Sequence, residues 1–212
     1  MKLYLSSEGF GKHLSRLQHM VGEDKRVLFV DNAKDYNSPE EREAHVLEKQ
    51  KEFEQTGFDF FELDLRNYFG SPATLKPLVE AAPFVWVSGG NTFILRRAFE
   101  YSGFGTLLQN ALKSTDMVYG GSSAGSIIMT KTLRGTEKGD DPYLIPSGYN
   151  DEIIWDGLGL VYPQLVPHYQ SQWWSNEAQA MVDYFEHNDL KYETLRDGEV
   201  YIVDGDKEEK LT

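Results

Sequence analysis

Short apolar runs alternate along the chain with longer segments whose apolar residues recur at helical spacing. The runs typical of buried strands are Leu3–Leu5, Val27–Val30, Phe58–Leu65, Phe84–Val87 and the run that begins at Met117. The segments between them predict helices over Gly11–Val21, Ser38–Gly57, Pro72–Glu80, a run with Leu95, Ala98 and Phe99, and Gly105–Leu112. This rhythm predicts a doubly wound α/β fold, in which a mostly parallel sheet is covered on both faces and the functional loops follow the carboxyl ends of the strands.

The segment that begins at Ser38 carries three agreeing signals of a helix start. Ser38 is a capping residue, Pro39 suits the first turn, and Glu41 is placed to complete a capping box. We expect Gly57 to end this helix. Its apolar residues, which we expect to face the core, are Ala44, Leu47 and Phe53.

Three further elements are predicted in the last third of the chain. The apolar run Leu158–Leu165 leads into Pro167-His168-Tyr169. Ser175 is expected to cap a helix whose buried face carries Ala178, Met181, Val182 and Phe185. Two short runs then predict strands joined by a hairpin-like turn at Arg196-Asp197-Gly198, namely Tyr192–Leu195 and Glu199–Val203.

A short run of small residues lies between two apolar runs and has the pattern G-x-S-x-G: Gly121-Ser122-Ser123-Ala124-Gly125. This pattern is typical of a sharp strand-to-helix turn that exposes a nucleophilic serine, with glycines where a Cβ atom has no room. Ser123 is then the candidate nucleophile, and the N–H of Ala124 is free to stabilise negative charge. The alternative is an ordinary turn rich in glycine and serine.

A second loop of interest is Ser88-Gly89-Gly90-Asn91-Thr92-Phe93, which follows the predicted strand Phe84–Val87. Two adjacent glycines at the carboxyl end of a strand let the backbone approach a ligand and present an N–H group to it. Gly90 is therefore a second candidate donor to an oxyanion. A plain connection between strand and helix is the alternative.

His168 is the one histidine of five that a loop signal surrounds, because the others fall in helical segments: His13, His19, His45 and His187. A histidine that follows a strand end suits a general base. Asp197 stands in an Asp-Gly dipeptide, which is an ordinary turn former. Asp140 and Asp141 lie in a polar surface loop, residues 135–149, which we expect near the site.

Composition narrows the class of protein. With 212 residues, of which 40% are hydrophobic, the chain suits one domain over residues 1–212. No cysteine is present, so the chain has no disulfide, thiolate metal site or cysteine nucleophile. The net charge of −13 argues against nucleic acid or an anionic membrane as partner. No long apolar segment is found, and we expect a cytoplasmic protein, monomeric or homodimeric.

As a set, four stretches resemble peptidase E, the aspartyl dipeptidase family, and its relative cyanophycinase: Ser88–Phe93, Gly121–Gly125, Pro167–Tyr169 and Leu195–Gly198. The resemblance implies a flavodoxin-like fold of the class I glutamine amidotransferase type. It also implies that Ser123 is the nucleophile, His168 its base and Asp197 the acid that orients the histidine. Gly90 and Ala124 would form the oxyanion hole, Asn91 and Tyr169 would contact a small peptide substrate, and no metal or cofactor is implied.

Two departures from the family pattern affect the expected site. The family has a glutamate where this chain has Asp197, so the turn must come closer to His168. The family also follows the histidine with an arginine-bearing segment, whereas residues 170–176 contain no basic residue. A buried carboxylate without a cationic partner is costly, so we expect no preference for aspartate unless Arg96, Arg97 or Arg134 reaches the site. Trp173 and Trp174 could line an apolar pocket or simply pack.

The sequence therefore predicts a serine peptidase that cleaves an amide bond in small peptides by acyl transfer. Two alternatives remain open. In an α/β-hydrolase esterase the acid would lie between serine and histidine in the chain, which makes Asp140 or Asp141 the candidate. A binding module without catalytic activity on the same fold is the other, because a fold does not guarantee a reaction.

Overall fold

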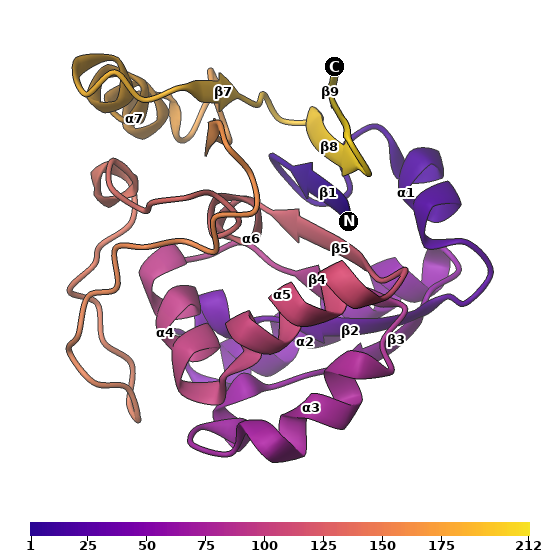
Figure 1. The fold of residues 1–212 in the computed structure, drawn as a ribbon. Helices are drawn as coiled ribbons and strands as arrows, with labels where there is room; N and C mark the ends of the chain where they lie inside the picture. Colours follow the sequence, from indigo (N-terminus) through magenta and orange to yellow (C-terminus); the bar gives the residue numbers. More distant parts are fainter.

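The apolar runs become the strands of one seven-stranded sheet in a computed structural model that describes residues 1–212 (Figure 1). The strands are β1 (Lys2–Ser6), β2 (Arg26–Val30), β3 (Asp59–Glu62), β4 (Phe84–Val87), β5 (Val118–Ser122), β8 (Val200–Asp204) and β9 (Lys207–Leu211). Their order is β3-β2-β4-β5-β1-β8-β9; the first five strands are parallel, β8 pairs antiparallel with β1, and β9 pairs antiparallel with β8. The predicted single-domain α/β fold with a mostly parallel sheet is confirmed.

Helices cover both faces of the sheet (Figure 1). One face packs against α3 (Pro72–Glu80), α4 (Thr92–Ser102) and α5 (Phe104–Ser114), and the other against α1 (Leu14–Val21) and α2 (Pro39–Gln55). Neighbouring residues of a strand point to opposite faces, so Val85 joins the first core and Trp86 the second. Short 3₁₀ turns connect the elements: η1 (Asn32–Lys34), η2 (Leu65–Tyr68) and η3 (Thr136–Lys138). The third predicted strand is shorter than expected because Leu65 already begins η2.

A third, smaller layer lies beside the sheet. It consists of α7 (Ser175–His187) and a two-stranded parallel sheet of β6 (Gln164–Val166) and β7 (Tyr192–Thr194), and in Figure 1 α7 and β7 lie together at one edge of the molecule. The buried residues predicted for α7 are confirmed and form its core with β6: Ala178, Met181, Val182 and Phe185.

The predicted hairpin around Arg196-Asp197-Gly198 is wrong, because its two strands belong to different sheets. β7 pairs with β6, whereas β8 pairs antiparallel with β1. The reason is burial: the first four residues of β8 are fully or nearly buried and need a place inside the large sheet, while the residues of β7 are only half-buried. The turn thus carries the chain from the small sheet to the large one.

Two helix starts can be compared with their predictions. At α2 the capping box is present: Ser38 Oγ accepts the N–H of Glu41 at 3.2 Å, and the Glu41 carboxylate accepts the N–H of Ser38 at 2.9 Å. At α7 the helix begins with Ser175, and the cap position is Trp174, one residue earlier than expected. Ser171 Oγ accepts the N–H of Trp174, so a serine still serves this helix start.

The buried face predicted for α2 is partly wrong. Ala44 and Leu47 are exposed, and the side chains that face inward are Arg42, Val46 and Phe53. Arg42 donates to the buried carboxylate of Asp35 at 3.1 Å. Because an unpaired buried carboxylate is costly, this ion pair outweighs burial of a few apolar atoms and sets the rotation of the helix.

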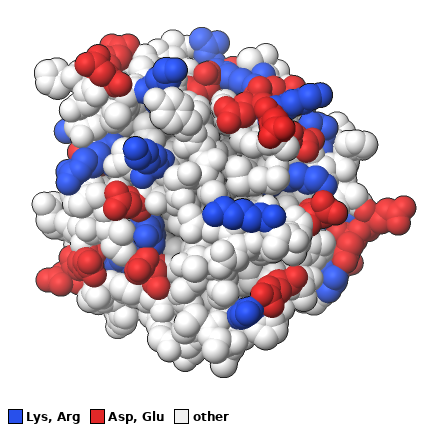
Figure 2. Space-filling model, in the orientation of Figure 1, with Lys and Arg blue, Asp and Glu red and all other residues white.

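Charges of both signs are interspersed over the face of the molecule that Figure 2 shows, and neither sign gathers into a large uniform area. None of the helices combines the length and apolar composition that crossing a bilayer requires. The expected absence of nucleic acid and membrane partners remains a prediction.

Candidate active site

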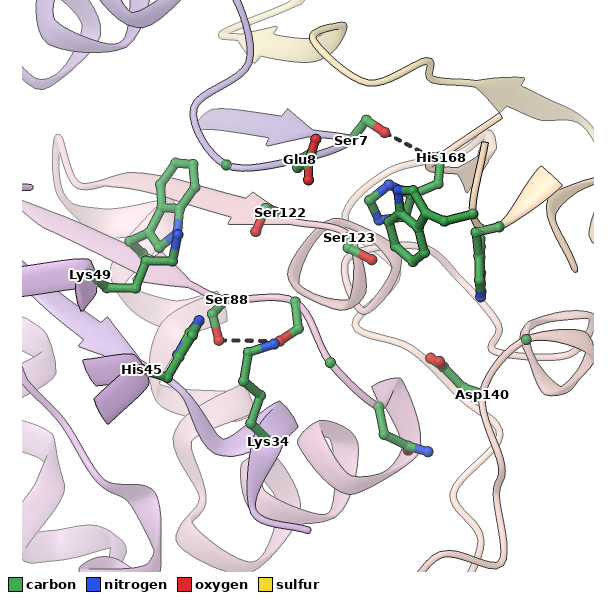
Figure 3. A pocket seen from close by; sticks show the side chains of 18 of the residues that line it. Ser7, Glu8, Lys34, His45, Lys49, Ser88, Ser122, Ser123, Asp140 and His168 are labelled. Carbon is green, nitrogen blue, oxygen red and sulfur yellow. Dashed lines mark hydrogen bonds between the residues drawn. The ribbon is translucent and has the colours of Figure 1, made fainter. Parts of the chain in front are cut away.

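A cavity of about 510 Å³ opens where the carboxyl ends of β1, β2, β4 and β5 meet. Its floor is made by the turns that follow β4 and β5, which carry Gly89, Gly90 and Ser123. One wall comes from η1 and α2, and the opposite wall comes from residues 168–174 (Figure 3). The cavity therefore lies where ligands bind in open parallel sheets.

Ser123 occupies the predicted sharp turn between β5 and the short helix α6 (Ala124–Ile127). Its backbone has φ 51° and ψ −112°, a combination that L-residues rarely adopt and that costs on the order of 1–3 kcal/mol. The flanking glycines are sterically required, because a Cβ on Gly125 would lie 2.3 Å from the carbonyl oxygen of Val87 and one on Gly121 would lie 2.4 Å from that of Gly125. Such a turn places the hydroxyl of Ser123 in the cavity.

His168 follows β6, is only 4% exposed, and shares the cavity with Ser123. Its Nδ1 lies 2.7 Å from Asp197 Oδ1. A carboxylate can only accept, so Nδ1 carries the proton and Nε2 is left to face the cavity. Ser7, which follows β1, adds two bonds: its Oγ accepts the backbone N–H of His168 at 2.7 Å and donates to Asp197 Oδ1 at 2.9 Å. Asp197 thus holds the imidazole ring, and Ser7 holds both the backbone of His168 and the carboxylate of Asp197.

Neither of the two alternative acids contacts His168. The Asp140 carboxylate accepts the N–H of Thr92 at 2.9 Å, and the Asp141 carboxylate accepts the N–H of Tyr143 at 2.8 Å. Burial raises the pKa of Asp140 to about 6, although the bond from Thr92 opposes the shift. The acid beside the histidine therefore comes after it in the chain, which differs from the order required of an α/β-hydrolase esterase.

The N–H groups of Gly90 and Ala124 donate to no other group of the protein. Gly90 has φ 146°, and a Cβ there would lie 2.5 Å from the carbonyl oxygen of Ala33, so only glycine fits. Gly90 lines the cavity, and Ala124 directly follows Ser123. Free N–H groups on both sides of the serine can stabilise an oxyanion.

The two predicted substrate contacts have different surroundings. Asn91 lines the cavity, but its Oδ1 accepts two N–H groups at the start of α4 and its Nδ2 donates to the carbonyl of Asp141. Tyr169 packs beside the core of the small layer and does not line the cavity. The neighbouring Trp173 and Trp174 do line it, and the ring centroid of Trp173 lies 4.4 Å from that of His168. Substrate contacts through Asn91 and Tyr169 remain predictions.

The three arginines considered as partners for a substrate carboxylate do not line the cavity. Arg96 bonds to Glu100, and the guanidinium of Arg134 lies over the ring of Trp155. Arg97 is fully buried, and its nitrogens donate to carbonyl groups that hold the loop beside the cavity, those of Pro142, Leu144 and Glu152.

The basic side chains of the cavity come instead from the wall made by η1 and α2, namely Lys34, His45 and Lys49 (Figure 3). Lys49 is paired with Glu52 at 2.7 Å, and His45 Nδ1 lies 2.9 Å from the carboxylate of Asp31. Lys34 forms no salt bridge, and burial lowers the pKa of its ammonium group. Lys34 is thus the one of these three side chains that has no carboxylate paired with it, and its burial disfavours the charged form.

The residues that sequence reasoning missed divide into two kinds. Ser7 and Asp31 each directly follow a parallel strand, and the rule that ligands bind beyond the carboxyl ends of strands could have singled them out. His45 and Lys49 carry no such signal, because their position depends on how α2 is rotated.

Comparisons with known proteins identify the family of the chain. The family model described as Peptidase family S51 matches residues 4–211. A relative from Pasteurella multocida (strain Pm70), known only as an uncharacterised peptidase, is 28% identical over 161 residues, which are 76% of this chain and 73% of the relative. An uncharacterised peptidase of Listeria innocua (serovar 6a) is 27% identical over 180 residues, 84% of this chain and 80% of the relative.

Solved structures show the same fold. A candidate peptidase E protein from Listeria monocytogenes EGD-e superposes with a TM-score of 0.80 at 21% identity, covering 99% of this chain and 97% of that one. A peptidase from an acI-B1 Actinobacterium superposes with a TM-score of 0.70 at 14% identity, covering 100% of this chain and 93% of that one. Because the family model spans nearly the whole chain, the protein belongs to peptidase family S51, the peptidase E family of serine peptidases.

Proposed function

We propose that this serine peptidase hydrolyses an amide bond in small peptides, as a dipeptidase does, with Ser123, His168 and Asp197 as its triad. The observation that carries the proposal is the pair of bonds on His168. Asp197 holds Nδ1 at 2.7 Å and Ser7 holds the backbone N–H, while Ser123 lies in the same cavity on a strained turn. Triad catalysis requires a base that a third group orients toward a nucleophile, and these contacts support that role for His168.

In the first half of the reaction, His168 Nε2 takes the proton of Ser123 as its oxygen attacks the substrate carbonyl. The N–H groups of Gly90 and Ala124 stabilise the resulting oxyanion, and each such donor contributes about 10²–10³-fold in rate. His168 then protonates the leaving amine as the C–N bond breaks. Ser123 is left as an ester of the acyl group.

In the second half, water gives a proton to His168 and attacks the ester. The oxyanion forms again between the same two N–H groups, and its collapse returns the proton to Ser123 and releases the acid. Asp197 stabilises the positive imidazole that forms in each half. Its shorter side chain, compared with the glutamate of the family pattern, is compatible with this role because the turn at residues 196–198 brings its carboxylate to 2.7 Å from the ring.

A cavity of about 510 Å³ lies in the range of about 300–1,000 Å³ that holds small ligands, which supports a short peptide as substrate. Lys34 changes the expectation for its side chain. Lys34 has no carboxylate paired with it, and an anionic group of the ligand would supply the partner that offsets the cost of burying its charge. We therefore propose that the substrate carries a carboxylate in its acyl part, although no arginine follows His168.

A panel of dipeptides Asp-X, Asn-X and Leu-X with the same second residue tests this proposal, with kcat/KM as the measured quantity. We expect Asp-X to exceed the others by more than about tenfold, which corresponds to roughly 1.4 kcal/mol. Lys34→Met should remove that preference, whereas Lys76→Met, a lysine on the far side of the sheet that pairs with Glu80, should keep it. Equal values for all three dipeptides would contradict an acidic substrate while leaving the peptidase assignment intact.

A further inference from the structure

Asp31 is a fully buried carboxylate that connects two parts of the active site and has no role in the triad. It follows β2 at the carboxyl edge of the sheet. One of its oxygens accepts Nδ1–H of His45 from α2 at 2.9 Å, and the other accepts the hydroxyl of Ser88 from the turn after β4. The carboxylate thus joins a helix on one side of the cavity to the loop on its floor.

Ser88 begins the loop that presents the N–H of Gly90. The main chain of this loop is bonded to the segment that contains Asp31 at both ends: Ser88 N–H donates to Val30 at 3.0 Å, and Asn91 N–H donates to Ala33 at 2.8 Å. Between these ends lie only Gly89 and Gly90, the residues with the most backbone freedom. The bond from Ser88 to Asp31 is the side-chain anchor that limits this freedom.

The position of this loop matters because it also packs against the nucleophile. A Cβ on Gly89 would lie 2.9 Å from Cβ of Ser123, so the two turns are in close contact. An oxyanion donor acts only when its N–H lies about 2.7–3.1 Å from the developing charge. A shift of the loop by a fraction of an ångström would therefore weaken catalysis without closing the cavity.

His45 is the member of this network that reaches the cavity, where its side chain is 20% exposed. Figure 3 places it on the same wall as Lys34 and close to Ser88. Asp31 can only accept, so it fixes the proton on Nδ1 of His45 and leaves Nε2 toward the cavity. The ring therefore serves as a rigid partner that holds Asp31 from the side opposite Ser88.

We propose that Asp31 is a positioning residue for the oxyanion hole, acting through Ser88 on the N–H of Gly90 and held in place by His45. The inference rests on the proposed function, since it assigns a task to residues around a loop whose Gly90 N–H is proposed to stabilise the oxyanion. It predicts an effect on the transition state and little effect on substrate binding.

The experiment measures kcat, KM and the Ki of a peptide boronic acid. When this inhibitor binds, the oxygen of Ser123 bonds to boron and the serine proton passes to His168, which gives a tetrahedral adduct that resembles the transition state. Ser88→Ala removes one hydroxyl, and Asp31→Asn removes the acceptor for His45. We expect each variant to lower kcat by about 10- to 100-fold, less than the loss of a whole donor, and to raise Ki by the same factor with KM within about twofold.

His45 is tested with a conservative and a severe variant. His45→Asn keeps a donor near the position of Nδ1 and should retain most of kcat, whereas His45→Ala should resemble Asp31→Asn. Ser102→Ala is the matched control for Ser88→Ala, because the hydroxyl of Ser102 is also buried but donates to the carbonyl of Ala98 in α4 and not to Asp31 or the loop. It should lower the thermal midpoint while leaving kcat unchanged.

The inference is overturned if Ser88→Ala and Asp31→Asn keep kcat and Ki within about twofold of the wild type. It is also overturned for His45 if His45→Asn and His45→Ala raise KM equally, because the histidine would then bind substrate directly. If Asp31→Asn does not fold, Ser88→Ala decides alone. A wild type that neither cleaves peptides nor binds the boronic acid at Ser123 would contradict the proposed function and this inference together.

Discussion

Replacing Asp197 by asparagine keeps the shape of the side chain and removes its charge. Oδ1 of Asp197 accepts from both His168 and Ser7, at 2.7 and 2.9 Å, so the amide oxygen of the variant is favoured in that place. The ring would then keep its tautomer but lose the partner of the positive charge that forms in the transition state. For charges about 4 Å apart at an effective dielectric constant of about 20, that loss is at most about 4 kcal/mol.

Asp197 is 29% exposed, and solvent reduces this energy to about 2–4 kcal/mol, which corresponds to roughly 30- to 1,000-fold in kcat. If the amide instead turns its NH₂ group to the ring, the tautomer is lost and the expected fall is about 10⁴-fold. The hydroxyl of Ser7 is the donor that favours the amide oxygen over the NH₂ group at this position. Combining Ser7→Ala with Asp197→Asn removes that donor, so the double variant should show the larger, about 10⁴-fold fall in kcat.

The assay is steady-state hydrolysis of the best dipeptide substrate by Asp197→Asn, Ser7→Ala and the double variant, with Asp140→Asn as the control. Thermal unfolding is followed in parallel to confirm that each variant is folded. An Asp197→Asn variant that keeps more than about a tenth of the wild-type kcat would refute the assignment. A large loss of kcat in Asp140→Asn, together with an active Asp197→Asn, would instead assign the acid that orients His168 to the loop of residues 135–149.

Three further predictions concern the surroundings of the triad. Gly90→Ala should abolish most activity and destabilise the fold, because its Cβ would lie 2.5 Å from the carbonyl oxygen of Ala33. The first effect is measured as kcat and the second as the thermal midpoint of unfolding. Asp140→Asn should be more stable than the wild type above about pH 6, by on the order of 1 kcal/mol, because the folded-state pKa of Asp140, about 6, exceeds the ordinary 3.8. The difference should vanish below about pH 4, where the carboxyl group is protonated in both states. Denaturant unfolding at several pH values measures this difference. Arg97→Met should cost several kcal/mol in denaturant unfolding, because it leaves buried carbonyl groups without donors.

Local signals explain why much of the fold could be predicted. Phe84–Val87 is buried on both faces, and Val27–Val30 is buried except for the half-buried Leu28, so both strands read as continuous apolar runs. The turn at Ser123 was recognisable because glycines are sterically required on both sides of it. Such features depend on a few neighbouring residues and appear directly in the sequence.

Features that depend on distant partners were not predictable in this way. The two strands around Arg196-Asp197-Gly198 resemble a hairpin locally, and only the space beside β1 decides that they separate. Likewise, Leu47 is exposed because α2 turns Arg42 and His45 toward buried carboxylates that belong to another part of the chain. His45 and Lys49 reach the cavity through that rotation, so a search for arginines near His168 could not find them.

The central claim is that Ser123 is the nucleophile, and covalent labelling tests it most directly. A peptide phosphonate that modifies active-site serines is incubated with the wild type, with Ser123→Ala and with Ser122→Ala, which changes the neighbouring serine at the end of β5. The modified residue is then located by mass spectrometry of the digested protein. The account predicts one label, on Ser123, that is retained in Ser122→Ala and absent in Ser123→Ala, with peptide hydrolysis lost in the latter by several orders of magnitude. A label on another serine, or hydrolysis by Ser123→Ala at more than a few per cent of the wild-type rate, would contradict it.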